Sequence, residues 1–356
     1  MKIQFLSIVV LFLFIRCTNE LSTTENIFLE PKNMIKAVDL SFLPEVRNSG
    51  QIYYNSNTQQ PEDMLVTLKK SGCNTVRLRL FHSPSSTTSS FETVKNLSEE
   101  IHNLGMKTWI TVHFSDSWAD PSQQTLPQAW QNLDYTTLKD SVFNYSKKIA
   151  LELQPDFVQV GNEINNGFLW PYGNSSNLVQ LKELLQQGIS GFRYFGSQII
   201  IHYAGIEETF LIDFDDSLDY DIYGVSYYPI WHGSKLYFEN FVNNVIVNNI
   251  SHKKIIIAET SYPFTFNWND QTNNVIGNNS QILPEFSASP QGQKDFLNFI
   301  KEKVNSSNSK IIGFSYWGGE WTSYKGSTAT DGSSWENQAF WDFNNQSLPV
   351  LDVYTD

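Results

Sequence analysis

The sequence contains little cysteine and few charged residues. Its 356 residues include only 2 cysteines, Cys17 and Cys73, which excludes a disulfide framework and leaves the fold to a hydrophobic core. Charged residues make up 17%, and 37 acidic side chains against 24 basic ones give a formal net charge of -13. Such a chain lacks the positive surface that binds phosphate backbones, so we expect no nucleic-acid partner.

Long apolar runs are missing after the N-terminus. Residues 3–15 form one run after Lys2, and about 13 residues is short for a membrane span, so residues 1–17 are predicted to be an export signal. Cys17 ends this run as the lipidated Cys of a lipoprotein signal would, but Arg16 stands where a small residue is usual. Both plain secretion and a surface lipoprotein, attached to a membrane only through Cys17, remain open.

The remainder of the chain is predicted to be one folded catalytic domain. Residues 18–30 are expected to be a tether, and residues 31–356 the domain. Hydrophobic residues make up 40% and aromatic residues 14%, which excludes a disordered chain. No GxGxxG or GxxxxGK[ST] motif is present, which argues against a doubly wound nucleotide-binding sheet.

Strand-like and helix-like segments alternate along the chain. Helical spacing of apolar residues marks segments 62–71, 91–104, 136–152, 178–195 and 291–303. Short apolar runs typical of buried strands recur eight times, at residues 35–40, 74–80, 107–114, 156–160, 198–203, 221–227, 254–259 and 311–317. This alternation predicts an α/β fold, a single-domain (β/α)8 TIM barrel.

Chemically capable side chains follow these strands. In such a barrel the active site lies at the C-terminal ends of the strands. Two glutamates, Glu163 and Glu259, follow the fourth and seventh strands, and a pair of carboxyl groups can cleave a glycosidic bond. The alternative is that each Glu caps the following helix. The other candidates at strand ends are Asp39, Arg77, Arg79, His113, Asp116, Trp118, Asn162, Tyr227, Trp317 and Trp321.

Several segments resemble one known family. The run Gly161 to Pro171, with Asn162 and Glu163, is similar to the acid/base segment of the endo-β-1,4-galactanases, glycoside hydrolase family 53. The segments that resemble the same family in the same order are 74–80, 113–121, 127–130, 224–229, 258–263 and 331–340. The resemblance covers about residues 35–343 and implies a (β/α)8 barrel.

The resemblance also implies an activity. Glu163 would be the acid/base and Glu259 the nucleophile of a retaining endo-β-1,4-galactanase, which cuts internal bonds in the galactan side chains of pectin. Its partner would be a neutral polysaccharide and no cofactor would be required. Some relatives hold calcium near the last two strands, but no ligand set maps onto residues 264–286, so any metal stays unknown. We expect a monomer.

Other functions remain open. The same machinery could act on β-1,4-mannan or β-1,4-glucan, and a non-catalytic glycan-binding protein could keep the tryptophans. Only the resemblance indicates galactose.

The supporting residues have expected roles. Arg77 or Arg79 and a Tyr227 hydroxyl would keep the nucleophile ionised, and Asn162 would bind a sugar hydroxyl. Asp39 would bind sugar or anchor the two arginines, and His113 would orient the nucleophile or touch substrate. Asp116 falls within one of the matching segments. Exposed indole rings suit sugar stacking, with Trp317 first, Trp118 next, and Trp321 beside the cleft.

The loop after the eighth strand departs from the family pattern. Where the family has Glu-Pro-Ala-Trp, this chain has Gly318-Gly319-Glu320-Trp321. Two glycines give the backbone more freedom than Glu-Pro, so this loop, and the sugar subsites beside it, are expected to be looser.

Overall fold

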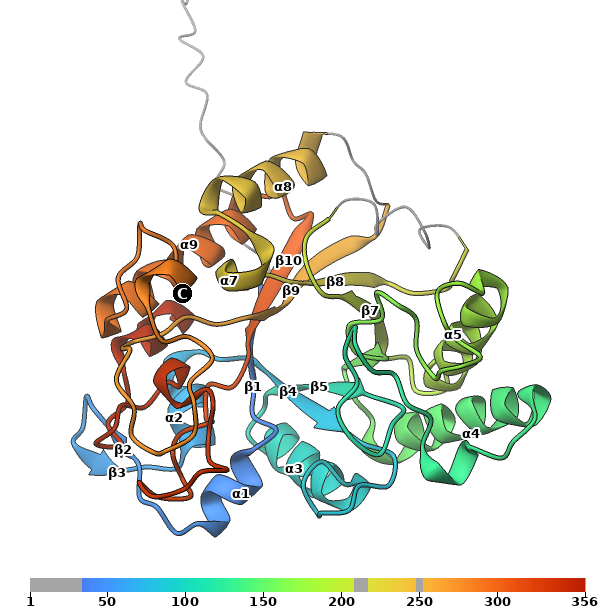
Figure 1. Ribbon diagram of the computed structural model, residues 1–356, viewed down its shortest axis with the longest axis horizontal. Helices are drawn as coiled ribbons and strands as arrows, with labels where there is room; N and C mark the ends of the chain where they lie inside the picture. The colour runs from blue at the N-terminus through green and yellow to red at the C-terminus, as the bar shows by residue number, and fades with distance from the viewer. Residues whose placement is uncertain (1–33, 208–216, 248–251, 356) are drawn as a thin grey trace, which may run out of the picture. The chain divides into compact units, whose positions relative to one another are not determined.

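Eight parallel strands form a closed barrel in the computed structural model, which describes residues 34–207, 217–247 and 252–355. The order around the barrel is β1-β10-β9-β8-β7-β6-β5-β4, with β1 closing against β4 (Figure 1). The strands are β1 Ile35–Asp39, β4 Thr75–Leu80, β5 Lys107–Val112, β6 Phe157–Val160, β7 Gln198–Tyr203, β8 Ile222–Ser226, β9 Lys254–Thr260 and β10 Ile311–Tyr316.

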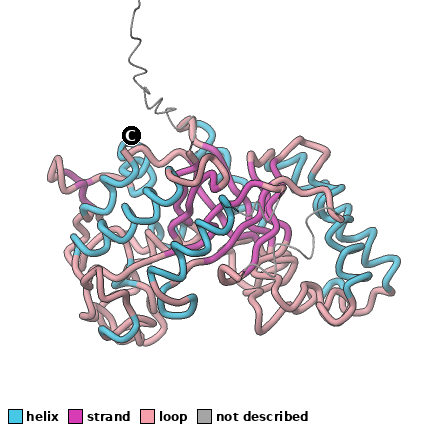
Figure 2. The backbone as a smooth tube through the Cα atoms, turned by 90° about the horizontal axis from the view of Figure 1, so that it is seen from above, coloured by secondary structure: helices cyan, strands magenta, loops and turns pink. Residues whose placement is uncertain are grey.

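Helices surround the strands, which lie at the centre in Figure 2. Several of these helices have an N-cap residue whose side chain accepts a hydrogen bond from a free backbone N–H group of the first turn. Asp63, Ser90 and Asp134 are such residues. The helices are α1 Leu43–Asn48, α2 Met64–Ser71, α3 Phe91–Asn103, α4 Tyr135–Leu153, α5 Leu178–Phe192, α7 Pro229–His232, α8 Lys235–Val247 and α9 Pro290–Asn305. A short hairpin joins β2 Tyr54–Asn55 to β3 Gln60–Pro61.

The core has two parts. A large apolar cluster includes residues of the strands and of the helices that pack on them, among them Leu78, Val158 and Leu184. A smaller cluster, which includes Ala37, Trp109, Ile200, Ile222 and Ile256, comes from alternate strand positions and fills the barrel interior. Beyond this smaller cluster, toward the C-terminal ends of the strands, the inward-facing side chains are polar, and they line the candidate site.

The predicted fold class is confirmed. All eight predicted strands are present with close boundaries, and so are the five predicted helices. The short helices α1 and α7, the longer helix α8 and the hairpin were not predicted. Cys73 is buried. The export signal at residues 1–17, Cys17 and the tether at residues 18–30 lie outside the described residues. Within the described ranges, no helix is long and apolar enough to cross a membrane.

Candidate active site

A cavity of about 450 Å³ opens at the C-terminal ends of the barrel strands. It brings together most of the residues predicted for the site, contributed by strands and loops that are far apart in sequence. The lining residues that were predicted are Asp39, Arg77, Arg79, His113, Trp118, Asn162, Glu163, Glu259, Trp317 and Trp321.

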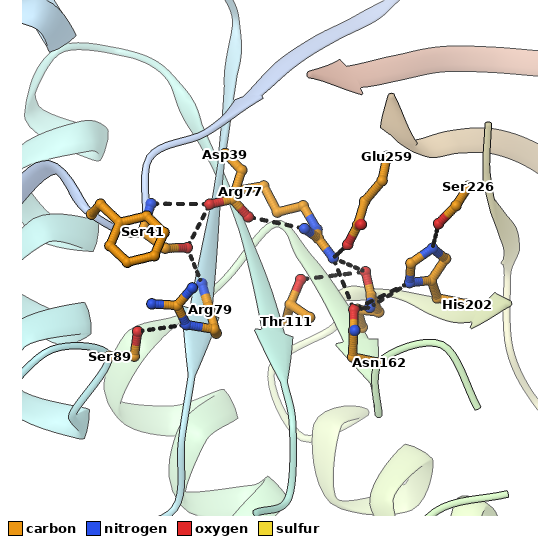
Figure 3. Close-up of polar contacts among 12 residues, drawn as sticks. Asp39, Ser41, Arg77, Arg79, Ser89, Thr111, Asn162, His202, Ser226 and Glu259 are labelled. Carbon is orange, nitrogen blue, oxygen red and sulfur yellow. Dashed lines mark hydrogen bonds and ion pairs between the residues drawn. The ribbon is translucent and has the colours of Figure 1, made fainter. Parts of the chain in front are cut away.

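Glu259 is held by charged and polar partners on both carboxylate oxygens. Arg77 Nη2 donates to Glu259 Oε1 at 2.7 Å, and the Tyr228 hydroxyl donates to Oε2 at 3.0 Å. Arg77 is in turn fixed by Asp39, whose Oδ2 accepts from Nη1 at 2.9 Å (Figure 3). Asp39 therefore anchors Arg77, the second of its two expected roles, and also lines the cavity.

Glu163 has a different environment. The residue follows β6 with a left-handed backbone, φ 45°, and its Oε1 accepts a hydrogen bond from the neutral Ser226 hydroxyl at 2.7 Å. Burial, reinforced by the negative charge of Glu259, raises the pKa of Glu163 to about 8. Glu163 therefore holds its proton near neutral pH.

The two carboxyl groups ionise in a defined order. Burial also raises the pKa of Glu259, but its ion pair with Arg77 and its bond from Tyr228 favour the carboxylate. Glu163 has no cation within hydrogen-bonding distance in the described structure. The pair therefore carries one negative charge, on Glu259, so that a protonated carboxyl group lies beside an ionised one.

Two histidines present neutral donors to the cavity. His113 Nδ1 accepts from the Ala119 N–H and His232 Nδ1 accepts from the Tyr228 N–H, both at 3.0 Å, so the proton of each neutral ring lies on Nε2. Burial and the nearby arginines lower the pKa of His113 well below its usual value, and burial lowers that of His232 to about 4. His113 thus lines the cavity with a neutral ring, and its expected role stays a prediction.

Arg79 lies in an aromatic cage. Its guanidinium carbon lies 3.9 Å from the ring centroid of Trp118 and 4.6 Å from that of Phe42, and Nε donates to Ser89 Oγ. Arg77, not Arg79, carries the contact to Glu259. One face of Trp118 is therefore covered, although 38% of the residue is exposed.

Indole rings line one side of the cavity. Trp317 packs edge-on against Trp321 and Trp335, with centroids 5.6 Å and 4.7 Å apart. Trp231 is 55% exposed, and its ring centroid lies 6.3 Å from that of Trp335.

The structure corrects the expectation for Tyr227. The Tyr227 hydroxyl donates to the Gly233 carbonyl and its ring stacks on Phe238, away from the cavity. Side chains of a strand alternate between faces, and Ile222 lies in the barrel interior, so positions 224, 226 and 228 follow it inward. Tyr228 is the residue that sequence reasoning missed, and counting alternate positions from Ile222 would have found it.

Asp116 differs from expectation. It does not line the cavity; its carboxylate accepts from the backbone N–H groups of Ser83 and Gln128 and so joins two loops. Asn162 lines the cavity, as predicted. Its Oδ1 accepts from Arg77 and its Nδ2 donates to the Ala119 carbonyl, so it also orients Arg77, and its binding of a sugar hydroxyl stays a prediction.

The loop after β10 is tightly packed, contrary to the expected looseness. A Cβ on Gly319 would lie 2.8 Å from Val38 Cγ1, and one on Gly318, where φ is +72°, would lie 2.9 Å from Trp335 Cδ1. Glu320 is fully buried, and its Oε1 accepts from the Phe42 N–H at 2.6 Å. The two glycines are required for close packing. The premise that they make the loop flexible is therefore wrong, and looser sugar subsites no longer follow from it.

Metal binding was left open by the sequence. Across residues 34–207, 217–247 and 252–355, no group of three or more His, Cys, Asp and Glu side chains is arranged to hold a metal ion.

The fold and site define a class. A (β/α)8 barrel with a proton-bearing glutamate and an ionised glutamate at one cavity is typical of glycoside hydrolases. The family model of glycosyl hydrolase family 53 matches residues 35–354, and the chain belongs to that family.

Relatives of known name span nearly the whole chain. The chain is 31% identical to the arabinogalactan endo-β-1,4-galactanase of Cellvibrio japonicus (strain Ueda107), with 88% of each protein aligned. It is 28% identical to the endo-β-1,4-galactanase of Bacillus subtilis (strain 168), over 91% of this chain and 86% of that protein. Among solved structures, the family 53 catalytic domain of Ignisphaera aggregans matches with a TM-score of 0.84 and 34% identity, over 90% and 95% of the two chains.

Proposed function

We propose that this protein is a retaining endo-β-1,4-galactanase that hydrolyses internal β-1,4-galactosidic bonds in type I arabinogalactan side chains of pectin. Family membership and the names of the relatives support the substrate. The observation that carries the chemistry is the unequal environment of the two glutamates. The Glu259 carboxylate is hydrogen-bonded to Arg77 and Tyr228, whereas among the described residues the Glu163 carboxyl group is hydrogen-bonded only to Ser226.

The reaction follows from these environments. Glu259 attacks the anomeric carbon while Glu163 gives its proton to the departing glycosidic oxygen, which leaves a covalent galactosyl-enzyme. Glu163, now a carboxylate, removes a proton from water, and that water breaks the ester to Glu259 on the same face of the sugar. Arg77 and Tyr228 hold Glu259 in place for the attack and for its release. Asp39 fixes Arg77, and no cofactor enters the scheme.

The substrate and the mechanism are tested together. Purified protein is incubated with galactan, β-1,4-mannan and a soluble cellulose derivative, with Glu163→Gln and Glu259→Gln variants as matched controls. We expect internal cleavage of galactan alone, loss of activity in both variants, and β-anomeric ends in NMR spectra of early products. Cleavage of mannan or glucan instead would identify a related glycanase, and binding without cleavage would identify a glycan-binding protein. Early α-anomeric product would contradict retention.

We also propose that the enzyme works outside the cytoplasm as a monomer. A long polysaccharide cannot enter a cell, and the apolar run at residues 3–15 supports export. Attachment through a lipid on Cys17 is tested by labelling cells with a fatty-acid analogue and comparing a Cys17→Ser variant. Label on the unchanged protein alone would establish the anchor, and an unlabelled protein recovered from the culture medium would establish plain secretion.

A further inference from the structure

A chain of buried polar side chains lies behind Glu163. It begins at Gln159 on β6, passes through His202 on β7 and Ser226 on β8, and ends at the Glu163 carboxyl group. Gln159 Nε2 lies 3.0 Å from His202 Nδ1, His202 Nε2 lies 2.9 Å from Ser226 Oγ, and Ser226 Oγ lies 2.7 Å from Glu163 Oε1. Gln159, His202 and Ser226 are each 0% exposed, and Figure 3 shows His202 bonded to Ser226.

The hydrogen bonds around His202 favour one position for its ring proton. Gln159 Oε1 accepts from Arg77 Nη2, so the amide nitrogen faces Gly161 O, Asn162 Oδ1 and His202 Nδ1, three acceptors for two hydrogens. His202 Nδ1 also lies 3.3 Å from Asn162 Oδ1, but the Gln159 nitrogen is nearer, at 3.0 Å, and a proton on Nδ1 would point toward the hydrogens of that nitrogen. The nearer donor makes Nδ1 the acceptor and leaves the ring proton on Nε2, facing Ser226.

Each member of this series of buried side chains then donates a hydrogen bond to the next, from Gln159 to Glu163. His202 Nε2 donates to Ser226 Oγ, so the Ser226 hydroxyl turns its own hydrogen to Glu163 Oε1. Oε1 is thereby kept as an acceptor. The transferable proton of Glu163 resides on the other carboxyl oxygen, Oε2.

We propose that His202 and Ser226 are positioning residues that confine the transferable proton of Glu163 to Oε2 and stabilise the carboxylate left after the proton has gone. This inference rests on the proposed role of Glu163 as the acid/base. The proton moves from Oε2 to the leaving oxygen and is replaced from water, and no proton passes through Ser226 or His202. The Ser226 bond strengthens when Glu163 becomes charged, which is when acid catalysis needs it.

The surroundings of Glu163 are consistent with a role through hydrogen bonding. The charged or ionisable groups that face it are Glu259 from β9, Arg77 from β4, Asp120 from the loop after β5, and Tyr228 after β8. Burial and the positive charge of Arg77 hold the pKa of His202 well below its ordinary value. The imidazole is therefore neutral throughout the working pH range and adds no charge of its own.

The test is the pH dependence of Ser226→Ala. Removing the hydroxyl removes a bond that favours the Glu163 carboxylate, so the alkaline limb of kcat/KM on galactan should move about one pH unit higher, with kcat/KM lower by roughly 10- to 100-fold. An activated aryl β-galactoside needs no proton in its first step and should change by no more than about threefold. The matched control is Ser315→Ala on β10, because Ser315 is equally buried and its Oγ has no hydrogen-bond partner within the described ranges.

The outcomes separate the positioning role of Ser226 and His202 from a general loss of packing. A damaged fold would scale both substrates alike and leave the alkaline limb in place. That result, or an equal response of Ser315→Ala, would overturn the proposal. A second measurement is a ¹³C NMR titration of the Glu163 carboxyl group, identified by its loss in Glu163→Gln. If the protein cut no galactan, the proposed function would fail, and an upward shift of this titration in Ser226→Ala would still support the effect of the Ser226 hydrogen bond on Glu163.

Discussion

At the scale of single residues, the site depends on which of two adjacent tyrosines faces the cavity. Tyr228 donates to Glu259 Oε2, while Tyr227 donates to the Gly233 carbonyl. Tyr228→Phe is expected to lower kcat/KM on galactan by roughly 10- to 100-fold, because a bond to the nucleophile is lost. Tyr227→Phe should cost only about 1 kcal/mol of stability. Steady-state kinetics of both variants provide the measurement, and equal kinetic losses would contradict the assignment.

The two glutamates should set the pH profile of kcat/KM. The pKa of Glu163 is raised to about 8, and its acid form is the active one, so activity should fall as pH rises through that value. Burial raises the pKa of Glu259, whose carboxylate is the active form, so the acid limb should lie above the ordinary range of a glutamate. Initial rates on galactan from pH 3 to 10 measure both limbs. An alkaline limb absent below pH 10 would contradict the role of Glu163.

Removal of the acid/base has a distinctive signature. In Glu163→Ala an activated aryl β-galactoside should still form the covalent enzyme, but turnover should stall because no base activates water. Added azide needs no base and should restore turnover, giving a β-galactosyl azide. Glu259→Ala serves as the control and should not respond in this way. Product analysis by NMR would contradict the assignment if azide restored only Glu259→Ala, or gave an α-azide with Glu163→Ala.

At the scale of elements, the tight packing of the loop after β10 predicts that Gly319 cannot carry a side chain without strain. Gly319→Ala should cost about 2–3 kcal/mol, because its Cβ would meet Val38 Cγ1 and Phe340 at ordinary backbone angles. Gly326→Ala is a matched control in the same loop; its φ is +94° but nothing lies within 4 Å of the added carbon, so about 1 kcal/mol is expected. Urea unfolding compares the two. A larger cost at Gly326 would contradict the packing argument.

Sequence patterns predicted the eight strands correctly but were less reliable for the roles of the residues at the strand ends. Buried parallel strands are nearly continuous apolar runs, so eight such runs identify the barrel, and the barrel collects their ends in one place. The pairing of β8 with β9 shifts in register between Val225 and Ser226, and this shift brings Glu259 beside Ser226. Such an irregularity has no signal in composition. The prediction of a loose loop at Gly318 and Gly319 failed because the close contacts with Val38 and Trp335 arise from tertiary packing, which the local sequence does not show.

At the scale of the whole molecule, Glu163, the proposed acid, should make the free energy of unfolding depend on pH. A carboxyl group whose pKa is raised from 4.5 to about 8 by folding stabilises the native state below pH 4.5, and this contribution is lost as pH rises through about 8. Glu163→Gln cannot ionise, so its melting temperature should exceed that of the unchanged protein by more at pH 9 than at pH 5. About 1–3 kcal/mol, or roughly 2–6 °C, is expected. Calorimetry at both pH values would contradict this if the difference were equal or reversed.

The central claim is that Glu259 attacks a galactosyl unit while Glu163 supplies the proton. The most direct test is to incubate the protein with a 2-deoxy-2-fluoro-β-galactosyl compound that carries a good leaving group, and to locate the adduct by peptide mass spectrometry. The fluorine slows breakdown of the covalent intermediate, so the label should accumulate on the peptide that contains Glu259, and Glu259→Gln should remain unlabelled. A label on Glu163, or efficient galactan cleavage with no covalent adduct, would contradict the account.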